Sequence, residues 1–339
     1  MMNIPKKIYV LCGFILFCVA CSMAQKRIQK SDHFDGHVYF NPFPDYKKKG
    51  FSDFISWRMN SVSPVWEERE IKPITHLPSQ SIEGSVTFIN HATTAIQLDG
   101  TVVLTDPIWA ERASPVSFAG PKRYHAPALS LKQLGWVDIV VISHSHYDHL
   151  CLETLIELEK LYSPLFIAPL GLEDLLSSHD LVHIKTLDWW ESINHKNLNI
   201  TLAPAQHWSK RTLFNDNHTL WGSYYIQSKK HRVYFGGDTG YGPHFKQIYE
   251  RLGPADLALL PIGAYKPEWF MKDNHMGPKD VPLVKKELHA NYVMAIHFGT
   301  FPLGDDGQDE PEEVLLEEAK TQEDPSHYIV PKVGQSLIL

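Results

Sequence analysis

The sequence has few cysteines, and nearly all of them lie at its start. Three of the four (Cys12, Cys18 and Cys21) fall within the first 21 residues, and only Cys151 lies beyond them. The body of the chain therefore has no pair of thiols to join, and packing has to stabilise it without disulfides. Repeats with a period of about 20–50 residues and low-complexity tracts are also missing, which argues against repeat architectures.

The chain also lacks an excess of positive charge. It has 32 Lys and Arg residues against 39 Asp and Glu residues, for a formal net charge of −7, and no basic stripe interleaved with aromatic residues. Phosphate neutralisation supplies most of the affinity of proteins for nucleic acid, so nucleic acid is not an expected partner. A long hydrophobic run is missing too, because the apolar run Ile8–Ala20 has 13 residues and a membrane-spanning helix needs about 20.

The first 21 residues of the sequence have the pattern of an export signal. A short basic lead, MMNIPKK, precedes the apolar run, which ends at CVACS. This ending resembles the lipobox of bacterial lipoproteins, with Cys18 where leucine is usual. The resemblance implies a signal peptide over residues 1–20, lipidation of Cys21, and a bacterial envelope protein anchored to a membrane on the periplasmic side. Simple secretion and a retained anchor are the alternatives.

The remainder divides into an irregular arm and an α/β body. Residues 21–81 are interrupted by prolines and predict short helices in an extended arm that packs on the core. In residues 82–339, β-branched runs such as VDIVVI and YVMAI are mixed with helix-compatible segments such as LETLIELEKLY. The segment LDGTVVL places a DG pair between two apolar runs and predicts a hairpin. We therefore expect a single α/β domain over residues 82–339.

Histidine and aspartate residues follow four of the predicted strands. The residues in these positions are His144, His146, Asp148 and His149 after VDIVVIS, His207 after LNITLAPAQ, Asp238 after RVYFGG, and His297 after YVMAI. Strand ends at one sheet edge are neighbours in space, so these side chains are expected to converge. Imidazole and carboxylate suit zinc, and seven such groups fit two ions if one carboxylate bridges. Asp238 is the natural bridge, because the glycines of GGDTG allow close backbone approach.

The motif HSHYDH matches the HxHxDH signature and resembles the metallo-β-lactamase superfamily. Longer motifs, including PAQHWSKRTLFNDNHTLWGS, FGGDTGY and PIGAYKPEWFM, resemble the N-acylphosphatidylethanolamine-hydrolysing phospholipase D family from about residue 39 to the C-terminus. This resemblance implies an αββα sandwich of two mixed β-sheets flanked by helices. Di-iron relatives carry a glutamate in HxExDH; His146 occupies that position here, which favours hydrolysis over oxygen chemistry.

The resemblance also implies a binuclear zinc site. It assigns His144, His146 and His207 to a first Zn²⁺. It assigns Asp148, His149 and His297 to a second Zn²⁺, with Asp238 bridging. Asp106 is expected to orient a ligand histidine, and His91 to be structural or to support a ligand. The expected catalytic residues are Asp148, Asp238 and His275. The expected substrate contacts are Tyr147, Tyr265, Trp269, Asn274 and His275.

The implied activity is phospholipase D hydrolysis of (N-acyl)phosphatidylethanolamine-like glycerophospholipids. A metal-bridging hydroxide would attack phosphorus, leaving phosphatidic acid and the head-group alcohol, an N-acylethanolamine. The expected partner is a membrane phospholipid, and a homodimer is kept as an open alternative. Two other functions remain open. One is a metallo-hydrolase of the same fold that cuts a lactone, a cyclic phosphodiester or a small ester. The other is a non-enzymatic metal-binding scaffold of the envelope.

Overall fold

Two seven-stranded sheets form the centre of the computed structural model, which describes residues 31–62, 64–79 and 84–339. The first sheet contains, in spatial order, β14 (Ser336–Ile338), β1 (Gly84–Asn90), β2 (Thr93–Leu98), β3 (Thr101–Thr105), β4 (Ile139–Val141), β5 (Leu165–Pro169) and β6 (Ile184–Leu187). The second contains β13 (Tyr328–Ile329), β12 (Tyr292–Ile296), β11 (Leu257–Pro261), β10 (Arg232–Phe235), β9 (Ser223–Gln227), β8 (Leu198–Ala203) and β7 (Ser192–His195). Each sheet combines parallel and antiparallel pairs.

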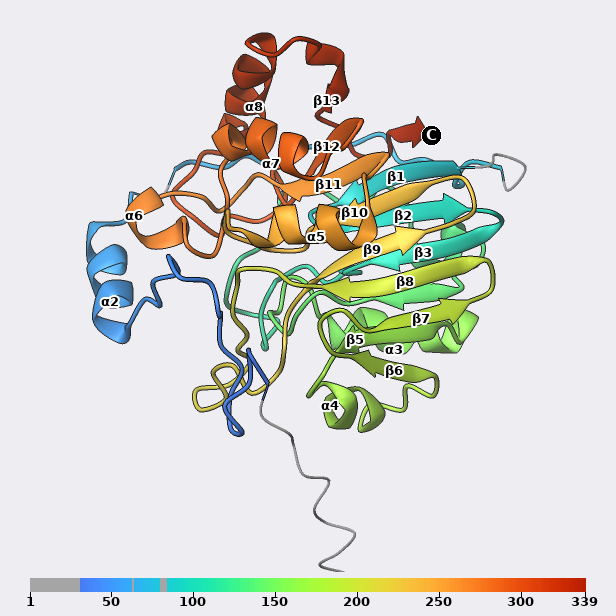
Figure 1. Cartoon of the computed structure of the whole chain (residues 1–339), viewed down its shortest axis with the longest axis horizontal. Coiled ribbons are helices and arrows are strands. Elements are labelled where there is room, and N and C mark those ends of the chain that lie inside the picture. The colour runs from blue at the N-terminus through green and yellow to red at the C-terminus, as the bar shows by residue number, and fades with distance from the viewer. Residues whose placement is uncertain (1–30, 63, 80–83) are drawn as a thin grey trace, which may run out of the picture.

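Helices cover the outer faces of both sheets (Figure 1). The first sheet packs against α3 (Leu152–Tyr162) and α4 (Glu173–Ser177), and the second against α5 (His244–Leu252), α7 (Val281–Glu287) and α8 (Glu310–Lys320). The remaining helical elements are α2 (Phe51–Asn60), α6 (Glu268–Met271), and the 3-10 turns η1 (Leu131–Leu134), η2 (Pro278–Asp280) and η3 (Pro325–His327). The predicted αββα sandwich of two mixed sheets is confirmed.

Alternation of side chains along the strands produces three apolar layers. In β4, Ile139 and Val141 lie in the layer between the sheets, whereas Val140 packs on the side of α3. In β11, Leu259 lies between the sheets and Leu260 packs on the side of α5 and α7. Successive side chains of a strand point to opposite faces, so β4 and β11, which are buried on both faces, are apolar along their whole length.

The DG pair forms the predicted hairpin. Strands β2 and β3 pair antiparallel with Leu98 opposite Thr101. Between them, Asp99 has φ 47° and Gly100 has φ 75°. A two-residue turn with both central residues at positive φ matches the twist of the flanking strands, and the Asp-Gly pair tolerates that conformation.

The described part of the arm packs against the sandwich at several places. Phe34, Tyr39 and Phe43 are buried in the layer between the sheets. Further along, the Trp57 ring of α2 stacks on Phe270 at 4.9 Å, which joins α2 to the neighbouring α6 (Figure 1).

The predicted signal peptide, Cys21 and the predicted domain start at residue 82 lie outside the described residues. Among the residues that are described, no helix has both the length and the apolar character needed to span a bilayer.

One buried histidine ties the start of the arm to the sandwich. His33 Nε2 lies 2.7 Å from Asp188 Oδ1, and its Nδ1 lies 2.6 Å from Asp32 Oδ1. Burial alone would lower the pKa of His33, but the hydrogen bonds with Asp188 and Asp32 outweigh it and raise the pKa above 6.5. Protonated His33, facing the carboxylates of Asp188 and Asp32, therefore stabilises the fold at pH values up to the ordinary histidine pKa of 6.5. This contribution to stability is lost as the pH rises through the raised pKa of His33.

We therefore expect His33→Gln to lower the melting temperature by a few degrees at pH 5.5 and by less at pH 9. Glutamine keeps a polar side chain but cannot carry the charge that faces the two carboxylates. Thermal unfolding at both pH values measures the effect, and His37→Gln, at a nearby exposed histidine, is the matched control. Equal losses at the two pH values would show that the ion pair does not stabilise the arm.

Candidate metal centre

The loops that follow β4, β8, β10 and β12 bring the seven predicted ligands to one place. The HSHYDH loop after β4 supplies four of them, and the loops after β8, β10 and β12 supply His207, Asp238 and His297. Six of the seven side chains are buried, and His146 is partly exposed. Because the sheets fix the strand ends, residues more than 150 positions apart become neighbours.

Three histidines form the first group. His144 Nε2 lies 2.8 Å from His146 Nδ1, and His207 Nε2 lies 3.2 Å from the same atom. The three ring nitrogens therefore surround one point. Zinc–nitrogen bonds of about 2.0–2.1 Å imply about 3.3 Å between neighbouring ligand atoms of a tetrahedral site, so these separations are close to the geometry that a single ion requires.

Asp148, His149 and His297 form the second group. Asp148 Oδ2 lies 3.1 Å from His149 Nε2 and 3.3 Å from His297 Nε2. These three atoms also fall within the separations expected for ligands of one ion. A fourth side chain joins this group, since His91 Nε2 lies 3.0 Å from the same carboxylate oxygen.

Asp238 lies between the two groups. Its Oδ2 is 3.9 Å from both His144 Nε2 and His207 Nε2 in the first group. In the second group, the same oxygen lies 3.2 Å from His149 Nε2, and Oδ1 lies 3.1 Å from His297 Nε2. A carboxylate in this position has an oxygen available to each group, as a bridging ligand needs.

The protonation of the first group suits metal binding. Burial lowers the pKa of His144 and His207 well below 6.5, and it lowers the pKa of His146 to about 4. These three imidazoles are therefore neutral at neutral pH, with a lone pair free for coordination. In the second group, burial opposes protonation, but the charge of Asp238 and the hydrogen bonds of His297 with Asp148 and Asp238 outweigh it and raise the pKa of His297 to about 9. A cation bound there would replace that proton.

Hydrogen bonds fix the orientation of three ligand rings from behind. Asp106 Oδ2 lies 2.6 Å from His149 Nδ1 and also accepts from Ser143 Oγ, so Asp106 does contact a predicted ligand histidine. His207 Nδ1 donates to the carbonyl oxygen of Asn274 at 2.9 Å, and His144 Nδ1 lies 2.8 Å from Ser143 Oγ. Partners of this kind set the tautomer and direct the Nε2 atom of each ring at the centre.

Two buried atoms at the centre test whether these residues fit a metal ion. His149 Nε2 and Asp238 Oδ1 make no hydrogen bond to any residue that the structure describes. Their nearest neighbours are other predicted ligand atoms, His149 Nε2 lying 3.1 Å from Asp148 Oδ2 and Asp238 Oδ1 lying 3.1 Å from His297 Nε2, without the alignment of a hydrogen bond. A divalent cation would satisfy both atoms, and four groups of His and Asp ligand atoms here lie close enough to hold one. The donor set therefore fits a metal site.

The predicted substrate contacts lie in different surroundings. His275 stands beside the centre, with Nδ1 3.8 Å from Asp238 Oδ2, and burial lowers its pKa to about 4. The Asn274 side chain accepts a hydrogen bond from Tyr46, and Trp269 is 47% exposed on α6. Tyr265 is buried, and its hydroxyl donates to Glu310.

Tyr147 lines a groove beside the ligand loop. Its hydroxyl donates to the Arg211 carbonyl, and the Arg211 guanidinium lies 4.0 Å from its ring centre. The groove has a volume of about 910 Å³ and is lined by Tyr147, Leu150 and Cys151 among others, but by none of the seven predicted ligands. A contact between Tyr147 and substrate therefore remains a prediction.

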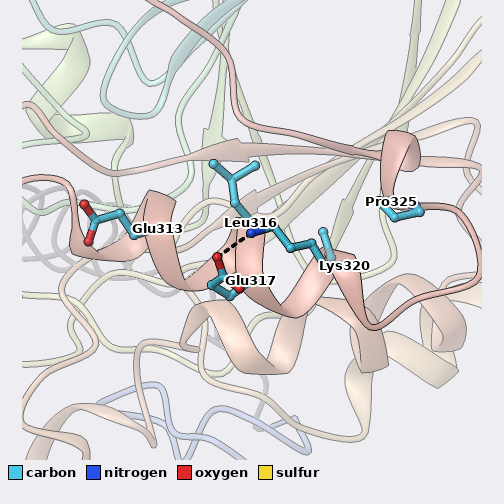
Figure 2. A pocket seen from close by; sticks show the side chains of 6 residues that line it. Glu313, Leu316, Glu317, Lys320 and Pro325 are labelled. Atoms are coloured by element: carbon cyan, nitrogen blue, oxygen red, sulfur yellow. Dashed lines mark hydrogen bonds and ion pairs between the residues drawn. The ribbon is translucent and has the colours of Figure 1, made fainter.

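A second hollow lies at the far helix α8. It has a volume of about 590 Å³ and is bordered by Glu313, Leu316 and Pro325 (Figure 2). Glu317 and Lys320 form an ion pair 2.5 Å long at its edge. No predicted site residue lines this hollow, so it offers none of the chemistry of the metal centre.

Two residues contribute more to the centre than the sequence indicated. His91, at φ 47°, contacts Asp148, and its carbonyl oxygen accepts from the His297 backbone N–H at 2.8 Å. His91 therefore contacts two predicted ligands and lies next to the second group. Trp208 was not predicted, yet its ring centre lies 4.6 Å from that of His146. Its position directly after His207 in the sequence was the only available signal.

Comparison with known proteins assigns the family. The profile described as "Beta-lactamase superfamily domain" matches residues 101–298, more than half of the chain. The chain belongs to the beta-lactamase superfamily. The predicted superfamily resemblance is thus confirmed, and so is the expectation of a metal-dependent hydrolase at the level of the family.

Relatives within the superfamily agree with this assignment. The chain is 41% identical over 229 residues to N-acyl-phosphatidylethanolamine-hydrolyzing phospholipase D 1 of Caenorhabditis elegans, an alignment that covers 64% of each protein. It is 40% identical over 258 residues to an uncharacterized protein of Mycobacterium bovis, covering 74% of this chain and 68% of that protein. The chain thus spans slightly less than two thirds of the nematode relative.

A solved structure supports the fold. A "possible metal-dependent hydrolase" from Veillonella parvula superimposes with a TM-score of 0.61 at 20% identity, covering 76% of this chain and all of that one. At this level of identity the match concerns the arrangement of the sheets and helices of the superfamily fold.

Proposed function

We propose that the chain is a zinc-dependent phosphodiesterase of the phospholipase D type. Its substrates would be (N-acyl)phosphatidylethanolamine-like glycerophospholipids, and its products phosphatidic acid and the head-group alcohol. The observation that carries the proposal is the position of Asp238 between two groups of three ligands. Such an arrangement would let Asp238 contribute to both ligand groups if each held a zinc ion, and pairs of metal ions of this kind supply the chemistry of phosphoryl-transfer sites.

Two zinc ions bound there would make a water molecule acidic near neutral pH and would neutralise charge that develops on the phosphoryl oxygens. The chain's own residues would hold and orient the reacting groups. Asp238 and Asp148 supply the two negative charges of the site, and Asp106 fixes His149. His275, 14% exposed at the edge of the centre, would contact the phosphate or donate a hydrogen bond to the departing alkoxide.

The proposed lipid substrate is supported by the names of relatives and by one exposed surface. The relatives include the nematode phospholipase D described above. On α2, Phe51 and Met59 are 79% and 81% exposed, and Lys47 and Lys48 lie just before the helix. An amphipathic helix with an outward apolar side and neighbouring lysines suits the surface of an anionic bilayer. We further propose that lipidated Cys21 anchors the chain on the periplasmic side of a bacterial membrane.

Product analysis tests the proposed function. Metal-loaded full chain is incubated with vesicles of N-acylphosphatidylethanolamine, phosphatidylethanolamine or phosphatidylcholine, and the products are identified by mass spectrometry. We expect phosphatidic acid with the matching head-group alcohol, and no release with the chelator-treated protein. Hydrolysis of lactones, cyclic phosphodiesters or small esters without phosphatidic acid would replace the proposal with the other hydrolase function. Absence of hydrolysis with full metal loading would favour the scaffold.

A further inference from the structure

A short segment of the arm, residues 39–49, lies across the back of the metal centre. The backbone of Tyr39 donates to the Asn217 carbonyl at 2.8 Å, and the Phe43 ring is buried in the layer between the sheets, 5.4 Å from the His244 ring. These contacts hold both ends of the stretch that includes Asn41. The segment precedes the matched superfamily region, which begins at residue 101.

Two side chains of this segment reach the first ligand group. Asn41 Nδ2 donates to the carbonyl oxygen of the predicted ligand His207 at 2.7 Å. The Tyr46 hydroxyl donates to Asn274 Oδ1 at 3.2 Å, and the Asn274 carbonyl accepts the hydrogen bond from His207 Nδ1. The segment therefore contacts His207 directly at its backbone and, through Asn274, at the rear of its ring.

A third contact joins the segment to the loop that carries His275. Lys49 Nζ lies 3.4 Å from Asp273 Oδ2, with side chains 19% and 9% exposed. The Asp273 carbonyl accepts from Gln206 Nε2 at 2.9 Å, directly beside His207. Asp273 also packs closely on Gly240, where a β-carbon would lie 2.4 Å from the Asp273 carbonyl oxygen. The loop 273–275 is thus held between the arm on one side and Gly240 on the other.

We infer that the arm segment 39–49 is part of the metal centre, with Asn41 and Tyr46 as positioning residues for His207. The ring of a metal-binding histidine has to keep its Nε2 atom directed at the ion, and the groups behind the ligand fix that direction. Here one arm residue holds the ligand's backbone, and a second holds the residue that accepts from its ring. The inference concerns metal affinity, so it can be tested apart from the identity of the substrate.

Metal affinity is therefore the primary measurement. Asn41→Ala and Tyr46→Phe each remove one of these hydrogen bonds from the full chain. Burial raises the pKa of Tyr46 to about 12, so its hydroxyl is a proton donor at all working pH values. We expect zinc at the first site to bind about 10-fold more weakly in either variant, as for other groups behind metal ligands. Competition with a chromophoric chelator measures this, and the melting temperature of the chelated proteins is recorded in parallel.

Matched variants separate positioning from a general loss of stability. Asn60→Ala removes an asparagine hydrogen bond of the same 2.7 Å length within the arm, to the Ser56 carbonyl, and Tyr162→Phe removes a hydroxyl bond to the Leu131 carbonyl. Both controls should leave the zinc affinity within about twofold. If Asn41→Ala and Tyr46→Phe changed zinc affinity no more than their controls, the inference would be wrong, whatever they did to the melting temperature. Both outcomes are read from zinc affinity, so neither depends on whether the protein hydrolyses a phosphodiester.

Discussion

Replacing Asp238 with asparagine is expected to reduce phosphodiester turnover by about 10³-fold or more while the protein remains folded. Asn has nearly the same size, so the 3% exposed position is filled without a cavity. Its amide has one oxygen and no charge, so it cannot serve both ligand groups. Each factor of ten in turnover corresponds to about 1.4 kcal/mol in the activation free energy. Losing several kcal/mol of charge stabilisation therefore accounts for a reduction of about 10³-fold or more.

Turnover and bound zinc are measured on the same preparation, with circular dichroism as the test of folding. Asp216→Asn is the control, because Asp216 is a half-exposed carboxylate paired with Lys210 at the surface. It should retain full turnover. An Asp238→Asn protein that kept two equivalents of zinc and near wild-type turnover would remove the bridging role from the proposed mechanism.

The second large effect is expected for His207→Ala. This change removes one nitrogen from the first group and leaves the second group complete. Bound zinc should fall from two equivalents to about one, and turnover by about 10²–10³-fold, the scale of losing one charge-stabilising contact. Elemental analysis and steady-state kinetics give the two values.

An exposed histidine provides the comparison for this variant. His183→Ala alters a solvent-exposed side chain away from the ligand groups and should change neither zinc content nor rate. Retention of two zinc equivalents by His207→Ala would show that His207 is not a ligand. Retention of one equivalent together with wild-type turnover would show that a single ion suffices and would contradict the binuclear scheme.

The structure confirms the elements for which the sequence had a strong local signal. The segment LETLIELEKLY is α3 over its full length, and VDIVVI contains β4. Long apolar runs and turn pairs such as Asp99-Gly100 determine their conformation locally, so they can be recognised without a fold. By contrast, β6 and β7 were not predicted. They are four residues each with partly exposed side chains, and pairing with β5 and β8 makes them strands.

The candidate site shows the same difference between residues with a local signal in the sequence and residues whose contacts depend on the fold. The ligand residues were recognisable because histidine and aspartate follow apolar strands, where a sheet edge gathers them. The contacts of residues elsewhere in the loops were not, because the direction of a loop side chain depends on what packs around it. Tyr265 is a predicted substrate contact, and the hydrogen bond from its hydroxyl to Glu310 had no signal in the sequence. Nothing near Asn41 in the sequence indicated that it would bond to a residue 166 positions away.

Patterns within the sequence indicated an α/β domain, the hairpin and the seven His and Asp residues at strand ends, because strand periodicity, turn residues and ligand chemistry are local properties; the αββα sandwich was implied by the resemblance to the superfamily. Tertiary structure alone decided that His91 meets Asp148, that Tyr147 lines a groove with Arg211, and that the arm reaches His207. Those contacts join segments that are distant in the chain. Their geometry follows from how the two sheets and the loops pack together, which local sequence patterns do not specify.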